Sequence, residues 1–168
     1  MDINLKQAWE TYGNGSHDTI VAMIDTGIDD THEDLKDTLW VNTDEIPGNG
    51  IDDDGNGYVM IGMGGISTII TIRSSPGMRT VTEPTGPGTI SAGTGNGIGI
   101  SGIVPGNRGP GDGVKALGGN DGGGSTAAVI KAIKYAEDNG AVICNLSLTS
   151  TTDDKALYEA MKNSGMLF

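Results

Sequence analysis

The first half of the chain carries two segments with a clear hydrophobic pattern. Within residues 5–12, apolar side chains recur at the spacing of one helix face, which predicts a short amphipathic helix that ends at Gly13. Residues 19–24, TIVAMI, form a continuous apolar run of strand length. Such a run is typical of a parallel strand that is covered on both faces.

The second half repeats the alternation of helix and strand. Residues 125–139 predict a helix, residues 141–148 (AVICNLSL) a buried strand, and residues 153–165 a second helix. Residues 166–168 open a further apolar run, in which the printed sequence stops, so we expect a fragment of a longer domain. This order predicts an α/β protein with right-handed crossovers.

The two helices of the second half have recognisable ends. Ser125 or Thr126 can cap the first, and Asp153 or Asp154 can cap the second, because these side chains accept hydrogen bonds from free N–H groups of the first turn. A glycine follows each helix as a stop signal.

The middle of the chain lacks such patterns. Residues 42–57 predict a polar, acidic, Gly-rich loop, and residues 66–72 (ISTIITI) are compatible with a strand. Residues 86–124 are dense in Gly and Pro and predict irregular structure. We therefore divide the chain into a first strand with an acidic loop (1–59), a Gly-rich irregular region (60–124) and a helix–strand–helix unit (125–168).

Composition narrows the classes of partner. The 168 residues include 29 Gly and carry a formal net charge of −12. This charge argues against nucleic acid and anionic membranes and is compatible with cation binding. Cys144 is the single cysteine, so an internal disulfide is excluded, and its apolar neighbours predict a small buried side chain. No segment is long and apolar enough to span a bilayer. Residues 1–2 lack the basic start of a signal peptide, which predicts an intracellular protein or a chain that begins after processing.

Two sequence signals suggest chemistry that the surrounding chain does not support. Residues 97–102, GIGISG, match a dinucleotide-binding pattern, but that site needs a helix directly after it, and VPGNRGPG follows. The segment around Asp25, AMIDTGIDDT, resembles the active site of retroviral-type aspartic proteases. Those enzymes are all-β, whereas residues 125–165 predict two helices. A capping carboxylate on a tight turn is the alternative role for Asp25.

A longer resemblance covers most of the chain outside residues 60–87. The segments IVAMIDTGID, THEDL, GTISAGTGNGIGISGI, GGGSTAAVIKAIKYAEDNGAVICNLSL and ALYEAMKNSGMLF resemble the subtilisin-like serine proteases (subtilases), in the order of that family. The resemblance implies a doubly wound parallel sheet, here incomplete at the C-terminus. It also implies that Asp25 is the aspartate of a Ser-His-Asp triad, which orients the histidine and stabilises its charged form.

The chain departs from the family where the catalytic histidine is expected. Aligning residues 88–90 with the family's G-T-I places Thr85 at the histidine position, and a hydroxyl does not titrate near neutral pH. His17 and His32 lie in other segments, and we expect both to be ordinary surface residues. In the family, the oxyanion-hole Asn and the nucleophilic Ser lie beyond the position that corresponds to Phe168.

Parts of the substrate cleft are retained. Residues 122–124 (Gly122, Gly123 and Gly124) match the edge segment that pairs with an extended peptide in the family. Ser147 and Leu148 match the strand that lines the primary specificity pocket. Thr149 replaces the glycine that follows in the family, and its branched side chain is expected to narrow the pocket.

An acidic loop predicts a cation site. Asp52, Asp54 and Asn56 alternate before Gly57, as in the first half of a calcium loop, and Tyr58 would add a carbonyl. Met63 stands where an EF-hand has its bidentate acid, so the loop is not an EF-hand. A solvated acidic turn is an equally good interpretation.

The resemblance implies a second calcium site. Asp34 and the side chain of Asn96, with the carbonyls of Ile98 and Ile100, match a calcium site of the family. Calcium is therefore the expected cofactor.

The sequence therefore predicts the N-terminal part of a subtilisin-like endopeptidase, inactive in this form, that acts on peptides or proteins and is secreted, as the family implies. The alternative is a non-catalytic calcium-binding or partner-binding module on the same fold. A histidine and a G-T-S-x-A segment in the parent gene would favour the protease. The oligomeric state is not indicated.

Overall fold

The computed structural model describes part of the chain at the level of individual residues. It describes residues 3–13, 19–25, 32–35, 40, 42–46, 48–58, 85–104, 111–115 and 125–168, with the backbone alone at 85–87 and 111–115. The predicted strand at 66–72 lies outside these ranges.

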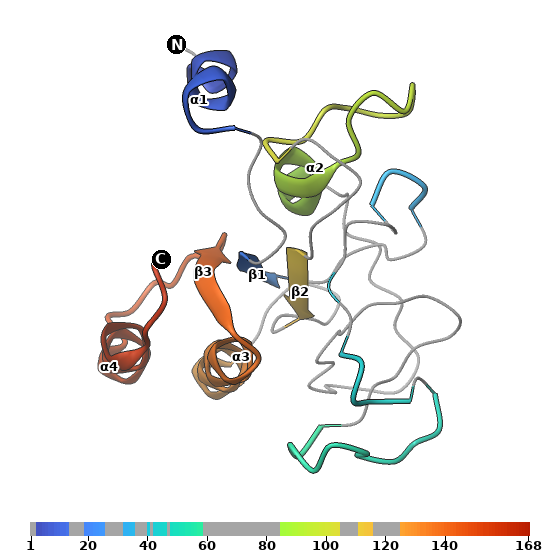
Figure 1. The fold of residues 1–168 in the computed structure, drawn as a ribbon. Coiled ribbons are helices and arrows are strands. Elements are labelled where there is room, and N and C mark those ends of the chain that lie inside the picture. Colours follow the sequence, from blue (N-terminus) through green and yellow to red (C-terminus); the bar gives the residue numbers. More distant parts are fainter. Residues whose placement is uncertain are drawn as a thin grey trace.

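The centre of the molecule is a parallel sheet of three strands (Figure 1). β1 (Ile20–Asp25) lies between β2 (Gly111–Lys115) and β3 (Ala141–Leu146). The last residue of β1, Asp25, is in register with the last residue of β2, Lys115. Parallel strands joined through helices confirm the predicted α/β class.

The described part of the chain contains four helices besides the sheet. They are α1 (Leu5–Tyr12), α2 (Thr85–Ser91), α3 (Thr126–Asp138) and α4 (Lys155–Asn163). Figure 1 draws α2 on one side of the row of strands and α3 and α4 on the other. α1 is mostly exposed, and its Trp9 indole N–H donates to the carbonyl of Ile103 at 2.8 Å.

The hydrophobic core lies between β1, β3 and α3. Ala22 and Ile24 alternate along β1 and are fully buried together with Ala132 and Ala136 of α3. Cys144 of β3 joins this core, and burial raises the pKa of its thiol to about 12. The thiol is therefore a neutral packing group, as the sequence predicts.

The ends of α3 and α4 are joined by side chains. Ser125 caps α3, and its hydroxyl accepts from the Ala128 N–H at 3.2 Å. Asp154 caps α4, and its second oxygen also accepts a hydrogen bond from the Thr126 hydroxyl. At the other end, Glu137 accepts from the Gly165 N–H at 2.7 Å. The two helices therefore run in the same direction and are held at both ends.

Most predicted elements are confirmed, within two residues at their ends. The strand predicted at 141–148 ends at Leu146, and the final apolar run forms a parallel bridge between Ile143 and Leu167. α2 and β2 were not predicted, because residues 86–124 contain the Gly and Pro that usually interrupt elements.

Candidate functional site

Asp25 is the last residue of the central strand β1. It therefore lies at the carboxyl end of the sheet, where ligands bind in open α/β folds. It is half-buried, and it follows Ile24, which is paired with Leu146 of β3. The segment Ser147–Leu148–Thr149 leaves β3 directly after this pair. The predicted triad aspartate and the predicted pocket segment therefore both lie at the carboxyl end of the sheet.

The predicted cleft residues after β3 are only partly open. Ser147 and Thr149 are exposed, whereas Leu148 is half-buried and packs against the core. The side-chain amide of Asn145 donates to the Ser147 hydroxyl at 2.8 Å, so Asn145 fixes that hydroxyl. Residues 122–124 lie outside the described ranges.

The expected histidine position, residue 85, is the first residue of a helix. Thr85 is the first residue of α2, and its side chain is not described. His32 is half-buried rather than exposed, and its Nδ1 accepts a hydrogen bond from the Asp34 backbone N–H at 3.2 Å. This contact turns His32 toward the loop of Asp34. His17 lies outside the described part of the chain.

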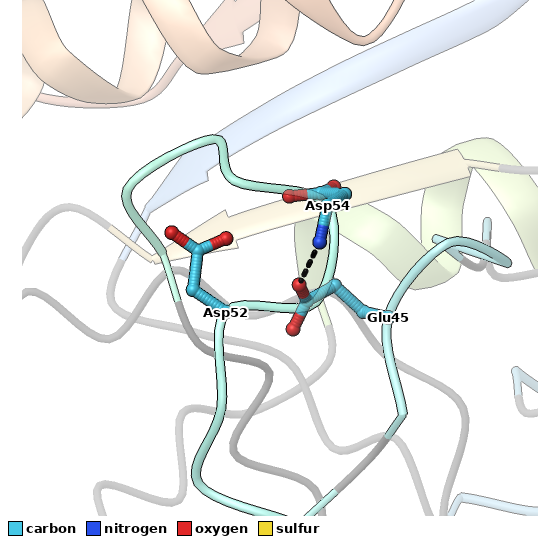
Figure 2. Close-up of side chains that lie close together, drawn as sticks. All are labelled: Glu45, Asp52 and Asp54. Carbon is cyan, nitrogen blue, oxygen red and sulfur yellow. Dashed lines mark hydrogen bonds between the residues drawn. The ribbon is translucent and has the colours of Figure 1, made fainter.

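Three acidic side chains converge in the loop after residue 42 (Figure 2). Oxygen atoms of Glu45, Asp52 and Asp54 lie within 4.8 Å of one another. Oxygens bound to one Ca²⁺ at 2.3–2.6 Å are at most about 5 Å apart, so the spacing fits a shared hard cation. Sequence reasoning found Asp52 and Asp54 but missed Glu45, because the repeat that marks the loop begins seven residues after it.

The backbone of this loop is held by the same carboxylates. Glu45 is buried and accepts from the N–H groups of Asp53 at 2.6 Å and Asp54 at 3.1 Å. Asp52 accepts from the Asn56 N–H at 3.0 Å and from the Gly57 N–H at 2.8 Å. These bonds bend the chain so that the acidic groups meet.

Asp54 stays ionised to lower pH than an ordinary aspartate. Desolvation acts to raise the pKa of Asp54, but hydrogen bonds from Asn42 and Asn56 outweigh it and lower the pKa below the usual value. Asn42 donates to Asp54 at 2.8 Å and is itself buried. An acid that remains charged is the form that a cation requires.

Asn56 and Tyr58 are the remaining predicted ligands of the loop. Asn56 lies beside Asp54 and donates to it through its side-chain amide at 2.8 Å, while its oxygen accepts from the Tyr58 N–H at 2.8 Å. The Tyr58 ring packs edge-on against Tyr135 of α3, with ring centroids 5.1 Å apart. The loop is thereby anchored to the core.

The second predicted site is a loop that wraps around Asp34. Asp34 is 5% exposed, and one carboxylate oxygen accepts from the Asn96 side-chain amide at 2.7 Å. The other oxygen accepts from the Ile100 N–H at 3.3 Å, and the Asn96 oxygen accepts from the Ile98 N–H at 3.0 Å. The structure thus joins Asp34 and Asn96 across 62 positions of sequence. For the Asn96 oxygen to join Asp34 on a cation, the amide must rotate.

In the described part of the chain, no helix directly follows the dinucleotide pattern. Residues 97–102 follow α2 and wrap around Asp34, and the next element in the described part of the chain is the strand β2. A pyrophosphate site at this pattern would need a helix N-terminus directly after it. The helices α3 and α4 likewise exclude the all-β fold of an aspartic protease of the retroviral type.

Comparisons with known proteins identify the class. The profile of the subtilase family (Peptidase_S8) matches residues 85–168. The chain is 33% identical over 144 residues to the major intracellular serine protease of Bacillus subtilis (strain 168), covering 86% of this chain and 38% of that protein. It is 31% identical over 151 residues to the halolysin-like extracellular serine protease Nep of Natrialba magadii, covering 87% of this chain and 23% of that protein.

The fold agrees with a solved protease structure. The structure of the prenylagaramide maturation protease PagA superposes with a TM-score of 0.60 at 18% identity, covering 96% of this chain and 46% of that chain. The chain belongs to the subtilase family. It spans less than half the length of each of these three proteins.

Proposed function

We propose that residues 1–168 are the N-terminal part of a subtilisin-like serine endopeptidase domain, with Asp25 as the triad aspartate. The observation that carries this proposal is the position of Asp25 at the carboxyl end of the central strand, beside the exit of β3. The complete domain would be a doubly wound parallel sheet, of which the described strands form a part. Its substrates would be extended peptides or proteins bound along residues 122–124 and Ser147–Thr149.

At residue 85, the chain has a threonine where a triad needs a histidine. Asp25 accepts a hydrogen bond from a histidine in a triad and stabilises the imidazolium, but it does not itself remove the proton of the nucleophile. Thr85 supplies no general base near neutral pH. We therefore propose that this polypeptide binds peptides without cleaving them.

Hydrolysis of an unfolded protein substrate tests this proposal. We expect no turnover above the level of an Asp25→Asn control, because loss of triad members costs a factor on the order of 10⁴–10⁶. Labelling by a serine-directed fluorophosphonate should likewise equal that of heat-denatured protein. Turnover that co-purifies with the chain, is blocked by the fluorophosphonate and falls in the Asp25→Asn variant would contradict the proposal.

The second candidate function is calcium binding, which the two oxygen clusters favour. Glu45, Asp52 and Asp54 bring carboxylate oxygens close enough together to share a hard cation, and Asp34 and Asn96 could share one if the Asn96 amide rotates. When bound, the ion would screen the repulsion among carboxylates and tie the loops together. The ligand set is small, so we expect weak binding, with a Kd of roughly 10⁻⁴–10⁻³ M.

Thermal unfolding in calcium or chelator measures this function. Calcium at about 100-fold excess over its Kd should stabilise the fold by roughly 2.7 kcal/mol. Asp52→Ala and Asp54→Ala should remove most of the effect, whereas Glu159→Gln, a charge change on the exposed face of α4, should retain it. If calcium raises Tm equally in all variants, the ion binds elsewhere, with Asp34 and Asn96 as the next site to substitute. If calcium changes none of them, the loop is a solvated acidic turn.

The cellular location stays a prediction. The family resemblance implies secretion, and the names of the two relatives give one intracellular and one extracellular protease. Within the described ranges, no helix is long and apolar enough to cross a membrane.

A further inference from the structure

Four Asn–Gly pairs lie in the described part of the chain. They are Asn49–Gly50, Asn56–Gly57, Asn96–Gly97 and Asn139–Gly140. The peptide nitrogen after an asparagine can attack the side-chain amide carbon, and glycine lacks the Cβ that hinders this approach. The surroundings of each pair therefore decide which asparagine reacts.

Two of the pairs have their attacking nitrogen engaged. The Gly140 N–H donates to the Glu137 carbonyl at 3.0 Å, at the end of α3. The Gly57 N–H donates to Asp52 at 2.8 Å. Attack from either nitrogen requires that bond to break first, which slows the reaction.

Asn96–Gly97 differs from these two pairs. Both residues are exposed, and no described residue accepts a hydrogen bond from the Gly97 N–H. The position of a Cβ on Gly97 has no heavy atom within 4 Å, so the attacking nitrogen is sterically open. Only the Asn96 side chain is restrained, through its contacts with the Ile98 N–H and the buried Asp34 carboxylate.

We propose that Asn96–Gly97 is a site of spontaneous deamidation and that Asp34 sets its rate by holding the Asn96 amide. Asp34 is 5% exposed, and its carboxylate also accepts a hydrogen bond from the Ile100 N–H. Its position relative to the Asn96 amide is therefore fixed. The charge-assisted bond at 2.7 Å keeps the amide carbon from turning toward the Gly97 nitrogen.

The reaction needs only water as co-reactant. The Gly97 nitrogen forms a bond to the Asn96 side-chain carbon, and the bond from that carbon to Nδ2 breaks. Nδ2 leaves as ammonia with the proton of the Gly97 N–H, which gives a cyclic succinimide. Water then opens the ring at either carbonyl and leaves a carboxylate in place of the amide, with either the normal or the isomerised backbone.

The product changes the loop that surrounds Asp34. The amide donor that faces the Asp34 carboxylate is replaced by a second carboxylate, so a hydrogen bond becomes a like-charge contact. Release of residues 93–101 from Asp34 is the expected result. The inference concerns the ion-free protein and does not depend on the proposed protease or calcium function.

Time-resolved peptide mapping by mass spectrometry, with chelator present throughout, tests the proposal. In the native protein, we expect deamidation at Asn96 to exceed that at Asn139. Asp34→Ala should accelerate the reaction at Asn96 by about tenfold, because it removes a hydrogen bond to a charged group. Asn96→Gln should abolish it, since the longer side chain cyclises less readily.

Asp53→Ala is the matched control variant. Asp53 accepts from the Asn49 side-chain amide at 2.8 Å, so its loss should accelerate deamidation at Asn49 and leave Asn96 unchanged. Equal acceleration of Asn96 and Asn139 in Asp34→Ala would show general unfolding and overturn the proposal. An unchanged rate at Asn96 in that variant, or a native rate no higher than that of Asn139, would overturn it as well.

Discussion

Asp34 is enclosed by backbone that passes too close for larger residues. A Cβ built on Gly99 would lie 2.3 Å from a carboxylate oxygen of Asp34, and one on Gly93 would lie 2.7 Å from the Asn96 amide nitrogen. Gly99 also has a φ of +53°, in the left-handed region that glycine favours. The absence of these two side chains is what allows the loop to reach a buried carboxylate.

Gly99→Ala should therefore destabilise the protein more than Gly95→Ala. Both positions have positive φ, so each substitution costs on the order of 1 kcal/mol in backbone strain. Gly99→Ala must in addition displace Asp34, at roughly 1–3 kcal/mol, whereas a Cβ on Gly95 has no heavy atom within 4 Å. Urea unfolding of both variants measures the difference. Equal midpoints would mean that Asp34 is not held where the structure places it.

A helix could be predicted from the sequence where the residues that cause it lie within the helix or next to it. α3 and α4 have capping residues, amphipathic spacing and a closing glycine within their own sequence, and both were predicted. α2 has Pro87 and two glycines in seven residues, yet it forms because Pro is tolerated in the first turn, where N–H groups lack intrahelical partners. Its last turns are held from outside, by the Ile103 and Val104 N–H groups bonding to carbonyls of Thr89 and Ile90.

At the candidate cation site, Glu45 likewise could not be predicted from local sequence. The alternation of Asp52 and Asp54 is visible in sequence, but Glu45 reaches them only because the intervening loop turns back on its own backbone. Likewise, Asn96 meets Asp34 through the tertiary fold, and only the family resemblance placed the two together.

The contact between the N-terminal ends of α3 and α4 should make the stability of the fold sensitive to acid. The pKa of Asp154 is lowered, first by the hydrogen bond from Thr126 and then by the N–H groups of Leu157 and Ala156. A depressed folded pKa gives stability that is present above the ordinary value of 3.8 and is lost as the pH falls through the folded pKa. Asp154→Asn should therefore lower the urea midpoint at pH 7 and flatten its fall in acid.

Thr126→Val is the control for this junction. It removes the hydroxyl donor and leaves the two backbone donors to Asp154, so its midpoint at pH 7 should lie between those of wild type and Asp154→Asn. If Thr126→Val equals wild type while Asp154→Asn is destabilised, the cap acts alone and the link between the helices adds nothing.

In the molecule as a whole, the candidate catalytic site and the candidate cation site lie on different supports. Asp25 and Ser147–Thr149 meet at the carboxyl end of the sheet, as expected for an α/β enzyme. The acidic loop is anchored separately, through the packing of Tyr58 on α3. Thr85, at the position where the resemblance leads us to expect a histidine, therefore need not disturb the predicted cation-binding parts of the chain.

We propose that Asp25 and residue 85 occupy the aspartate and histidine positions of a triad. The direct measurement is the imidazole pKa in a Thr85→His variant, followed by NMR and distinguished from His17 and His32 by comparison with wild type. A nearby carboxylate favours the charged imidazole, so we expect an imidazole pKa above the usual value of about 6.5, and a return toward that value when Thr85→His is combined with Asp25→Asn. An imidazole that titrates identically with and without the Asp25 carboxylate would show that residues 25 and 85 do not form two positions of a triad.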